Sequence, residues 1–202
     1  MSARFRFLMA AAVCVSATLS AVASATAAEQ DATPVDLKVG DPAPAFQLKD
    51  DTGKPWKSAN HYGKKIVVVY FYPADMTGGC TAQACGFRDD MGTLASKDVE
   101  VVGISGDTVK NHQLFKKAYD LNFTLLADPK GKVADKFGVP NTKGEKTVQK
   151  EIDGVPYTLT RGVTTQRWTF IIDRDGKIAY KDDQVQAQQD SKKIMAAIDS
   201  LR

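Results

Sequence analysis

The sequence has few of the side chains that most often bind metals or form hydrolytic dyads. Its 202 residues include three cysteines and two histidines. A structural zinc site needs about four such ligands at close spacing, and this chain does not supply them. His61 and His112 both occur among polar residues, so we expect both at the surface and neither paired with a catalytic cysteine. The sequence therefore predicts neither a metal site nor a Cys–His hydrolase.

The sequence also has little excess charge. Its formal net charge is +3, but Arg4 and Arg6 belong to the N-terminal leader, and residues 28–202 carry 25 basic and 24 acidic residues. Such a balance gives no electrostatic basis for binding nucleic acid. There are no internal repeats and no low-complexity tracts, and 43% of the residues are hydrophobic. Length and composition together predict one ordinary globular domain.

The N-terminal region differs from the rest of the chain. Two arginines come first, then an apolar run, then small residues with Ala-x-Ala patterns between Ala23 and Ala27. This order is typical of a secretory signal peptide. A transmembrane anchor is the less favoured alternative, because the apolar run gives way to Ser, Thr and Ala. We expect a signal peptide at residues 1–27, a connector at 28–39 and the domain at 40–202, with cleavage giving an exported, periplasmic protein that is not membrane-bound.

Two cysteines remain once the leader is removed with Cys14. Export permits a disulfide between Cys80 and Cys85. A loop this short stabilises a fold poorly, since the stabilisation by a disulfide increases with loop length. The two cysteines are therefore better explained by redox chemistry than by a disulfide that stabilises the fold. The Cys-x-x-Cys spacing is absent, which argues against a general thiol–disulfide exchanger.

Apolar periodicity predicts an α/β domain with a mixed sheet: strand–helix–strand–helix–strand, then a hairpin and a helix. Strands are expected at 45–48, 65–71, 99–105, 123–127, 167–173 and 177–180, and helices at 81–94, 107–120, 131–137 and 186–201. Residues 140–165 lack sustained periodicity, and only 157–160 at their centre are assigned to a further strand or hairpin.

The most informative position is a cysteine at the start of a helix. Cys80 follows Gly78 and Gly79 and precedes the helix expected from Thr81. Unpaired N–H groups and the helix dipole favour a thiolate there, and a thiolate can attack an O–O bond. Five residues along a helix separate two Cα atoms by about 8.5 Å, whereas a disulfide needs them within about 7 Å. Cys80 and Cys85 can therefore bond only if the helix start unwinds, which the neighbouring glycines would ease.

These residues resemble a known family. The run PADMTGGC, from Pro73 to Cys80, matches the Pro-x-x-x-Thr-x-x-Cys signature of the peroxiredoxins. The longer run FYPADMTGGCTAQACGFRDD resembles the Q-type branch, also called bacterioferritin comigratory protein, and the match continues from Gly40 to the C-terminus. The resemblance implies a thioredoxin-like fold, with a central mixed β-sheet flanked by helices. It also implies a thiol-dependent peroxidase for hydrogen peroxide and organic hydroperoxides.

The resemblance assigns a role to each site residue. It implies that Cys80 is the peroxidatic nucleophile, which becomes a sulfenic acid, and that Cys85 resolves it as an intramolecular disulfide. Thr77 would hold the peroxide through its hydroxyl, and Pro73 would shield the pocket from water. Arg167 would stabilise the thiolate and the negative charge that develops on the oxygens. The family needs no metal or organic cofactor, uses a thioredoxin-like or other thiol reductant, and permits a monomer or weak dimer.

The sequence departs from the family pattern at three places. Gly78 stands where proline is usual, and Gln83 stands where glutamate is common, which removes a charge near the thiolate. Residues 140–166 form a longer segment than expected, which could change partner docking or oligomerisation. Arg88 and Arg161 are expected at the surface.

Three other functions stay open. An exported thioredoxin-like thiol–disulfide oxidoreductase would act on protein disulfides and ignore peroxide. A copper chaperone with Cys80 and Cys85 as ligands would need a nearby histidine and a tighter cysteine spacing. A redox-inert structural domain would have no use for Thr77 and Arg167.

Overall fold

The structure is a computed structural model that describes residues 35–152 and 154–201. The expected signal peptide, residues 1–27, and the first part of the expected connector lie outside the described residues. The last part of the connector lies against the domain. The Nζ atom of Lys181 donates hydrogen bonds to the carbonyl of Leu37 (3.1 Å) and to Oδ1 of Asp36 (3.2 Å). Among the described residues, no helix is both long and apolar enough to cross a membrane.

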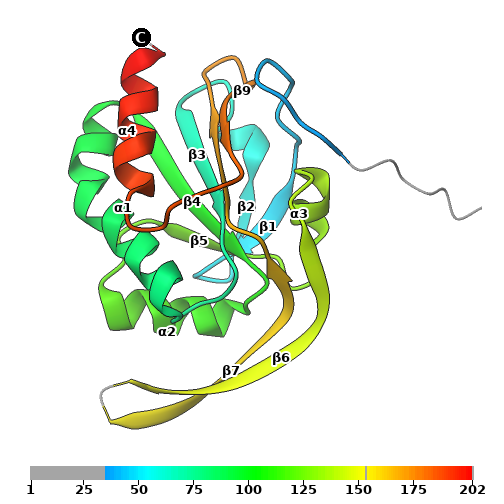
Figure 1. Cartoon of the computed structure of the whole chain (residues 1–202), viewed down its shortest axis with the longest axis vertical. Coiled ribbons are helices and arrows are strands. Elements are labelled where there is room, and N and C mark those ends of the chain that lie inside the picture. Colours follow the sequence, from blue (N-terminus) through cyan, green and yellow to red (C-terminus); the bar gives the residue numbers. More distant parts are fainter. Residues whose placement is uncertain (1–34, 153, 202) are drawn as a thin grey trace, which may run out of the picture. The chain divides into compact units, whose positions relative to one another are not determined.

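Strands and helices alternate between residues 66 and 136, as expected, and two short strands and a 3-10 turn precede them (Figure 1). In chain order the elements are β1 (Gln47–Asp50), β2 (Pro55–Lys57), a 3-10 turn (Ser58–Asn60), β3 (Ile66–Phe71), α1 (Gly78–Ser96), β4 (Val99–Ser105), α2 (Val109–Tyr119), β5 (Thr124–Ala127), α3 (Lys132–Lys136), β6 (Asn141–Ile152), β7 (Val155–Thr165), β8 (Trp168–Ile172), β9 (Ile178–Asp182) and α4 (Asp190–Ser200).

The central sheet is mixed, in agreement with the sequence prediction. Its strand order is β2-β1-β5-β4-β3-β8-β9. The pairs β3–β4 and β4–β5 are parallel, whereas β8 runs antiparallel to β3 and β1 antiparallel to β5. Strand β3 lies inside the sheet between β4 and β8, and all six of its residues are buried. A central strand covered on both faces explains its unbroken apolar sequence.

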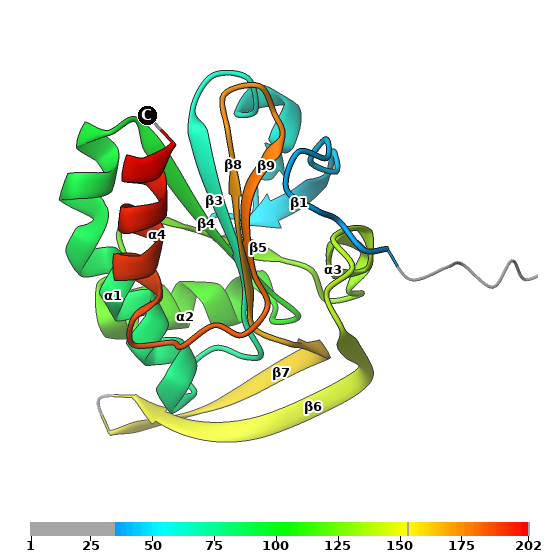
Figure 2. The same ribbon diagram turned by 45° about the horizontal axis from the view of Figure 1, so that its top comes forward.

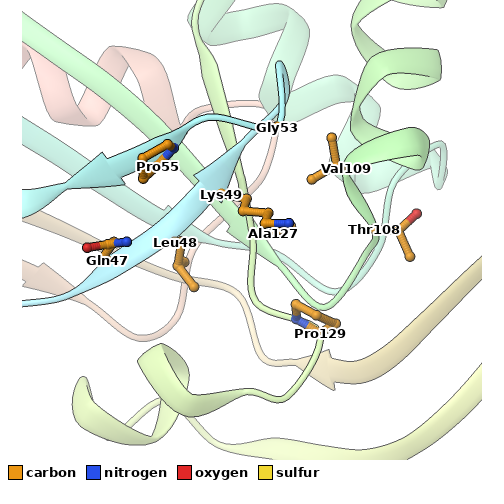
Figure 3. Close-up of a pocket in the computed structure, with 9 residues that line it drawn as sticks. All are labelled: Gln47, Leu48, Lys49, Gly53, Pro55, Thr108, Val109, Ala127 and Pro129. Carbon is orange, nitrogen blue, oxygen red and sulfur yellow. The ribbon is translucent and has the colours of Figure 1, made fainter.

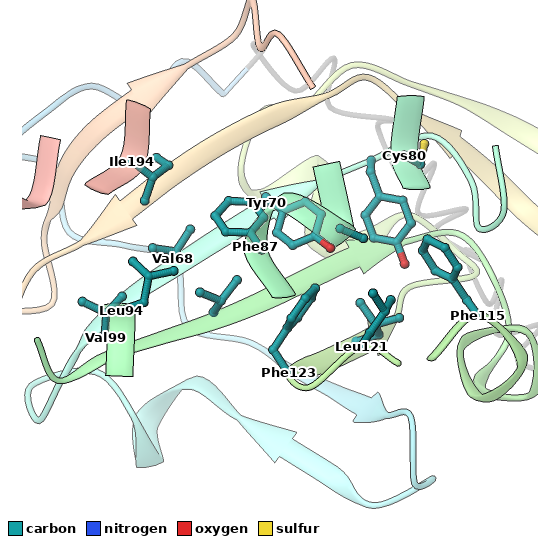
Figure 4. Packing of buried hydrophobic residues seen from close by; sticks show 14 of the residues in the cluster. Val68, Tyr70, Cys80, Phe87, Leu94, Val99, Phe115, Leu121, Phe123 and Ile194 are labelled. Atoms are coloured by element: carbon teal, nitrogen blue, oxygen red, sulfur yellow. The ribbon is translucent and has the colours of Figure 1, made fainter. Parts of the chain in front are cut away.

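Successive residues of β3 contribute to two different cores, because side chains alternate across a strand. Val68 and Tyr70 belong to the core under α1, α2 and α4, and Figure 4 shows Tyr70 beside Phe87 of α1. Val67 and Val69 belong to the core on the opposite face, which α3 covers. Figures 1 and 2 show α1 and α4 side by side on one side of the sheet. Cys80 is a member of the first core, so the site is built at the edge of packed hydrophobic side chains.

The sequence prediction for residues 140–165 was incomplete. A strand or hairpin was expected only near 157–160, whereas these residues form a long antiparallel hairpin, β6 and β7, which Figures 1 and 2 show extending past the end of the sheet. Most side chains of β6 are exposed, and the register shifts between Lys143 and Lys146. An exposed ribbon with an irregular register lacks the clean alternation of apolar residues that identifies a strand. Leu159 and Val163 of β7 are the buried anchors.

Candidate active site

Cys80 lies within the first turn of α1, not before it as the sequence predicted. The helix begins at Gly78, three residues earlier than expected, after Thr77 in an extended conformation (φ −94°, ψ 148°). The N–H of Thr81 donates to the carbonyl of Thr77 (2.8 Å) and closes the first turn around the cysteine. N–H groups of a first helical turn have no partner within the helix, and the dipole is positive there. The sulfur therefore lies where a negative charge is favoured.

The side chain of Arg167 reaches this sulfur. Its Nη2 donates to Cys80 Sγ at 3.3 Å, and the cysteine is only 1% exposed. The pairing of the strands explains the approach. Phe71, the last residue of β3, pairs with Trp168, so the chain enters β8 beside the loop that leads to Cys80. The structure thus brings together two predicted residues that are 87 positions apart.

Arg167 is itself held by a buried amide. Its Nη1 donates to Oε1 of Gln83, which is fully buried on α1. The Nε2 of Gln83 donates to Oδ2 of Asp190 (2.6 Å), at the start of α4. The same carboxylate oxygen accepts a bond from Oγ1 of Thr169 on β8 (2.8 Å). The contribution of Asp190 was not predicted from the sequence, since nothing local links a residue of the last helix to the site.

Cys85 lies on the same helix as Cys80, and both are free thiols. Cys85 is half-buried, whereas Cys80 is buried. Five residues of continuous helix keep the two Cα atoms about 8.5 Å apart, beyond the reach of a disulfide. The structure therefore corresponds to a reduced protein in which α1 is fully wound.

The loop between β3 and α1 carries the other two predicted site residues. Pro73 and Thr77 are half-buried, and Oγ1 of Thr77 donates to the carbonyl of Ala74 (3.1 Å). Met76, directly before Thr77, has a φ of 58°, which non-glycine residues adopt at an energetic cost. The buried side chain of Met76 packs in the core with Cys80, and this packing offsets the cost. The loop is therefore held in one defined conformation.

A buried polar cluster anchors this loop and corrects the prediction for one histidine. His112 is completely buried, not exposed, and its Nδ1 lies 2.8 Å from Oδ2 of Asp75. The hydroxyl of Tyr72 donates to the other oxygen of Asp75 (2.7 Å), and the N–H of Asp75 donates to Asp107 (2.9 Å). His112 lies one helical turn before buried Phe115 on α2, and this spacing was the available signal of its burial.

Opposite charges determine the protonation of this cluster. Burial by itself lowers the pKa of His112, but the charge and hydrogen bond of Asp75 oppose burial, and the net shift of the pKa is upward. Burial raises the pKa of Asp107, and the nearby charge of Asp75 adds to this shift. The loop that carries Pro73 and Thr77 is thus tied to α2 by a buried ion pair whose strength depends on pH.

Other candidates lie outside the site. His61 is half-buried, with its Nδ1 2.7 Å from Oε2 of Glu100. Arg88 and Arg161 are half-buried rather than exposed. Arg88 donates to the carbonyl of Tyr119, and Arg161 donates to the hydroxyl of Thr164.

No cluster of three or more His, Cys, Asp or Glu is placed to hold a metal ion within the described ranges. An open, mainly apolar pocket of about 590 Å³ lies between β1, β2 and the start of α2 (Figure 3). The residues that line it include Leu48, Pro55, Val109 and Pro129. None of the predicted site residues lines this pocket.

Comparison of the sequence with known proteins identifies the family of the chain. The model of the AhpC/TSA family matches residues 39–181. The chain is 43% identical over 145 residues to "Peroxiredoxin Bcp" of Escherichia coli K12, which covers 71% of this chain and 84% of that protein. It is 39% identical over 142 residues to "Peroxiredoxin Bcp" of Bacillus subtilis, covering 70% of this chain and 82% of that protein.

Solved structures agree with the sequence comparison. The crystal structure of "Peroxidoxin BcpB" from Mycobacterium tuberculosis superposes with a TM-score of 0.69 and 32% identity, covering 83% of this chain and 99% of that one. The prediction of a thioredoxin-like fold with a mixed central sheet is thereby confirmed. The chain belongs to the AhpC/TSA family of peroxiredoxins, and it is a thiol peroxidase.

Proposed function

We propose that this protein reduces hydrogen peroxide and organic hydroperoxides with Cys80 as the nucleophile and Cys85 as the resolving thiol. The observation that carries the proposal is the approach of Arg167 Nη2 to within 3.3 Å of the buried Cys80 Sγ, in the first turn of a helix. Two separate sources of positive potential act on one sulfur, and both favour its thiolate.

The first step is a two-electron transfer. The Cys80 thiolate attacks the terminal oxygen of the hydroperoxide, an S–O bond forms and the O–O bond breaks. The sulfur becomes a sulfenic acid, and the leaving alkoxide or hydroxide takes up a proton and departs as an alcohol or water. The guanidinium of Arg167 stabilises the negative charge on the oxygens as the bond breaks. No metal or organic cofactor takes part in this step.

Thr77 and Pro73 complete the proposed site. The hydroxyl of Thr77 donates to the carbonyl of Ala74, which leaves its lone pairs to accept a hydrogen bond from the peroxide. Pro73 has no N–H and so adds no competing donor to the pocket, while its ring excludes water from the sulfur. The anchored loop holds both residues in place before the peroxide arrives, which limits the entropy lost on binding.

The second step needs a conformational change. The sulfur of Cys85 attacks the Cys80 sulfenic acid, an S–S bond forms and the sulfenic oxygen leaves as water. Because the wound helix keeps the two cysteines too far apart, the first turns of α1 must unwind before this bond forms. A thioredoxin-like or other dithiol then reduces the disulfide and restores the two thiols. Resolution within one chain is compatible with a monomer or weak dimer.

Peroxide consumption by the full chain, measured with thioredoxin as reductant and again without any added thiol, tests the assignment. Cys80→Ser should lose turnover, whereas Cys85→Ser without added thiol should consume one equivalent and accumulate a sulfenic acid that dimedone traps. Cys14→Ser is the matched control and should turn over like the wild type. Substantial turnover by Cys80→Ser would mean that the nucleophile is misassigned. Normal turnover by Cys85→Ser with thioredoxin as reductant would exclude Cys85 as the resolving thiol.

We also propose that the protein is exported to the periplasm after cleavage near residue 27. The charged, apolar and small-residue order of the first 27 residues supports this proposal. Expression of the full chain in a bacterium with two membranes, followed by fractionation and N-terminal sequencing, tests it. A periplasmic protein that begins near Ala28 is expected, and an uncleaved chain in the cytoplasm would contradict the proposal.

A further inference from the structure

Gln83 connects the arginine of the site to a carboxylate, and chemistry determines which way its amide points. A guanidinium can only donate hydrogen bonds, so the Oε1 of Gln83 must face Arg167. The NH₂ group is then forced to the other side, where Oδ2 of Asp190 accepts from it at 2.6 Å. An amide between a donor and an acceptor has a single favourable orientation. If the amide of Gln83 were reversed, its NH₂ group would face the guanidinium donors of Arg167 and its oxygen would face the carboxylate of Asp190.

Asp190 is placed to act on this amide and not on its own helix. It is 1% exposed, and its Oδ2 accepts bonds from Gln83 and from Thr169 of β8. An acidic residue in the first turn of a helix usually faces solvent and interacts with the helix dipole. Here the carboxylate is directed instead toward α1 and the strand that follows Arg167. Its second oxygen, Oδ1, has no hydrogen-bond partner among the described residues.

We propose that Asp190 is a positioning residue of the peroxidase site, which orients Gln83 and through it aims the guanidinium of Arg167 at Cys80. The inference rests on the proposed function and extends the site to the last helix of the chain. A neutral Gln83 leaves the positive charge of Arg167 free to act on the sulfur, while Asp190 supplies the acceptor that the amide needs.

The alternative is that Asp190 only docks α4 onto α1. The two helices are closely packed at this point, since a Cβ added to Gly86 would lie 3.1 Å from Oγ of Ser191. Any disruption of the start of α4 would then impair the protein through its stability alone. Variants that separate hydrogen bonding from packing distinguish these accounts.

Three single variants of the full chain provide the first test. Asp190→Leu removes the acceptor and should slow the reaction of Cys80 with hydrogen peroxide by about tenfold, as expected when a hydrogen bond that orients a reacting group is lost. Asp190→Asn keeps an acceptor oxygen and should react within about twofold of the wild type, although its buried NH₂ should lower the melting temperature. Ser191→Ala, at the neighbouring buried position, should leave the peroxide rate unchanged.

A double variant gives the second test. Gln83→Glu places a carboxylate against Asp190, and repulsion between the two groups should slow the reaction. Adding Asp190→Asn replaces the repulsion with an amide donor and should restore at least half of the wild-type rate. A purely structural role for Asp190 predicts instead that the rate of each variant follows its melting temperature.

The rate of Cys80 alkylation by iodoacetamide, followed by peptide mass spectrometry, is measured for every variant. This rate depends on the contact between Arg167 and the sulfur, and it can be measured even if the wild type consumes no peroxide. Failure of this inference and failure of the proposed function therefore give different results. A wild-type alkylation rate in Asp190→Leu would overturn the inference. Equal losses in Asp190→Leu, Asp190→Asn and Ser191→Ala, or no rescue of Gln83→Glu, would overturn it as well.

Discussion

Gly78→Pro should slow the formation of the Cys80–Cys85 disulfide without preventing it. Gly78 is the first residue of α1, where proline is well tolerated because its N–H has no partner within the helix. A Cβ at this position would meet nothing within 4 Å. Thr77 already has the extended conformation that a following proline requires (φ −94°, ψ 148°). The folded loop therefore accepts the substitution without strain.

The size of this slowing follows from the conformational entropy of the unwound helix start. Proline at a compatible site stabilises a fold by about 0.4–1 kcal/mol because it restricts the unfolded chain. If the first turns of α1 unwind before Cys85 attacks, the same free energy is added to the cost of unwinding. Disulfide formation should then be about two- to fivefold slower.

Gly92→Ala is the control on the same helix. Gly92 lies beyond Cys85, is exposed and has no atom near an added Cβ. Alanine there should stabilise the protein by about 0.5–1 kcal/mol but leave the disulfide step unchanged if unwinding is confined to the helix start. Reduced protein is mixed with one equivalent of hydrogen peroxide and quenched, and mass spectrometry separates sulfenic acid from disulfide. An unchanged rate in Gly78→Pro, or an equal slowing in Gly92→Ala, would refute local unwinding.

The remaining predictions concern the site and the cluster that anchors it. Arg167→Lys removes a guanidinium whose two terminal nitrogens bind different partners, so stopped-flow peroxide reduction should be about 10- to 100-fold slower than in the wild type. A variant rate within about twofold of the wild-type rate would contradict the role given to the two guanidinium nitrogens. Because the folded-state pKa of His112 is raised, its stabilising contribution is complete below about pH 6.5 and is lost as the pH rises through the folded-state pKa. The free energy of unfolding of His112→Gln, measured with urea, should therefore fall less over this range than that of the wild type, and parallel curves would contradict the buried ion pair. Gly106→Ala places a Cβ 2.1 Å from the carbonyl oxygen of Val163 and should cost about 1–3 kcal/mol in thermal unfolding; an unchanged melting temperature would contradict this contact between the hairpin and the sheet.

The position of Cys80 could be predicted from the sequence because its causes are local. A buried strand, a glycine-containing loop and a helical pattern follow one another between residues 65 and 94, and each has its own signature. Arg167 came from the family resemblance alone. Its approach depends on the antiparallel pairing of β8 with β3, and a sequence pattern does not say which strands become neighbours.

Residues whose environment is made by distant parts of the chain were missed. In the sequence, Asp190 looks like an ordinary acidic residue in the first turn of a helix. Only the packing of α4 against α1 directs its side chain toward Gln83. His112 was expected at the surface because its sequence neighbours are polar, yet Asp75 provides a buried partner. The length of the β6–β7 hairpin was not predicted, because the hairpin buries few side chains and its strands therefore lack an apolar period.

The effect of Arg167 on Cys80 alkylation by iodoacetamide tests the central claim most directly. The claim is that the guanidinium of Arg167, 3.3 Å from Sγ of Cys80 in the first turn of α1, makes this cysteine the reactive thiol. The alkylation rate of Cys80 at pH 7, followed by peptide mass spectrometry of the reduced full chain, should be about tenfold lower in Arg167→Gln than in the wild type. Equal rates in the two proteins would contradict the account.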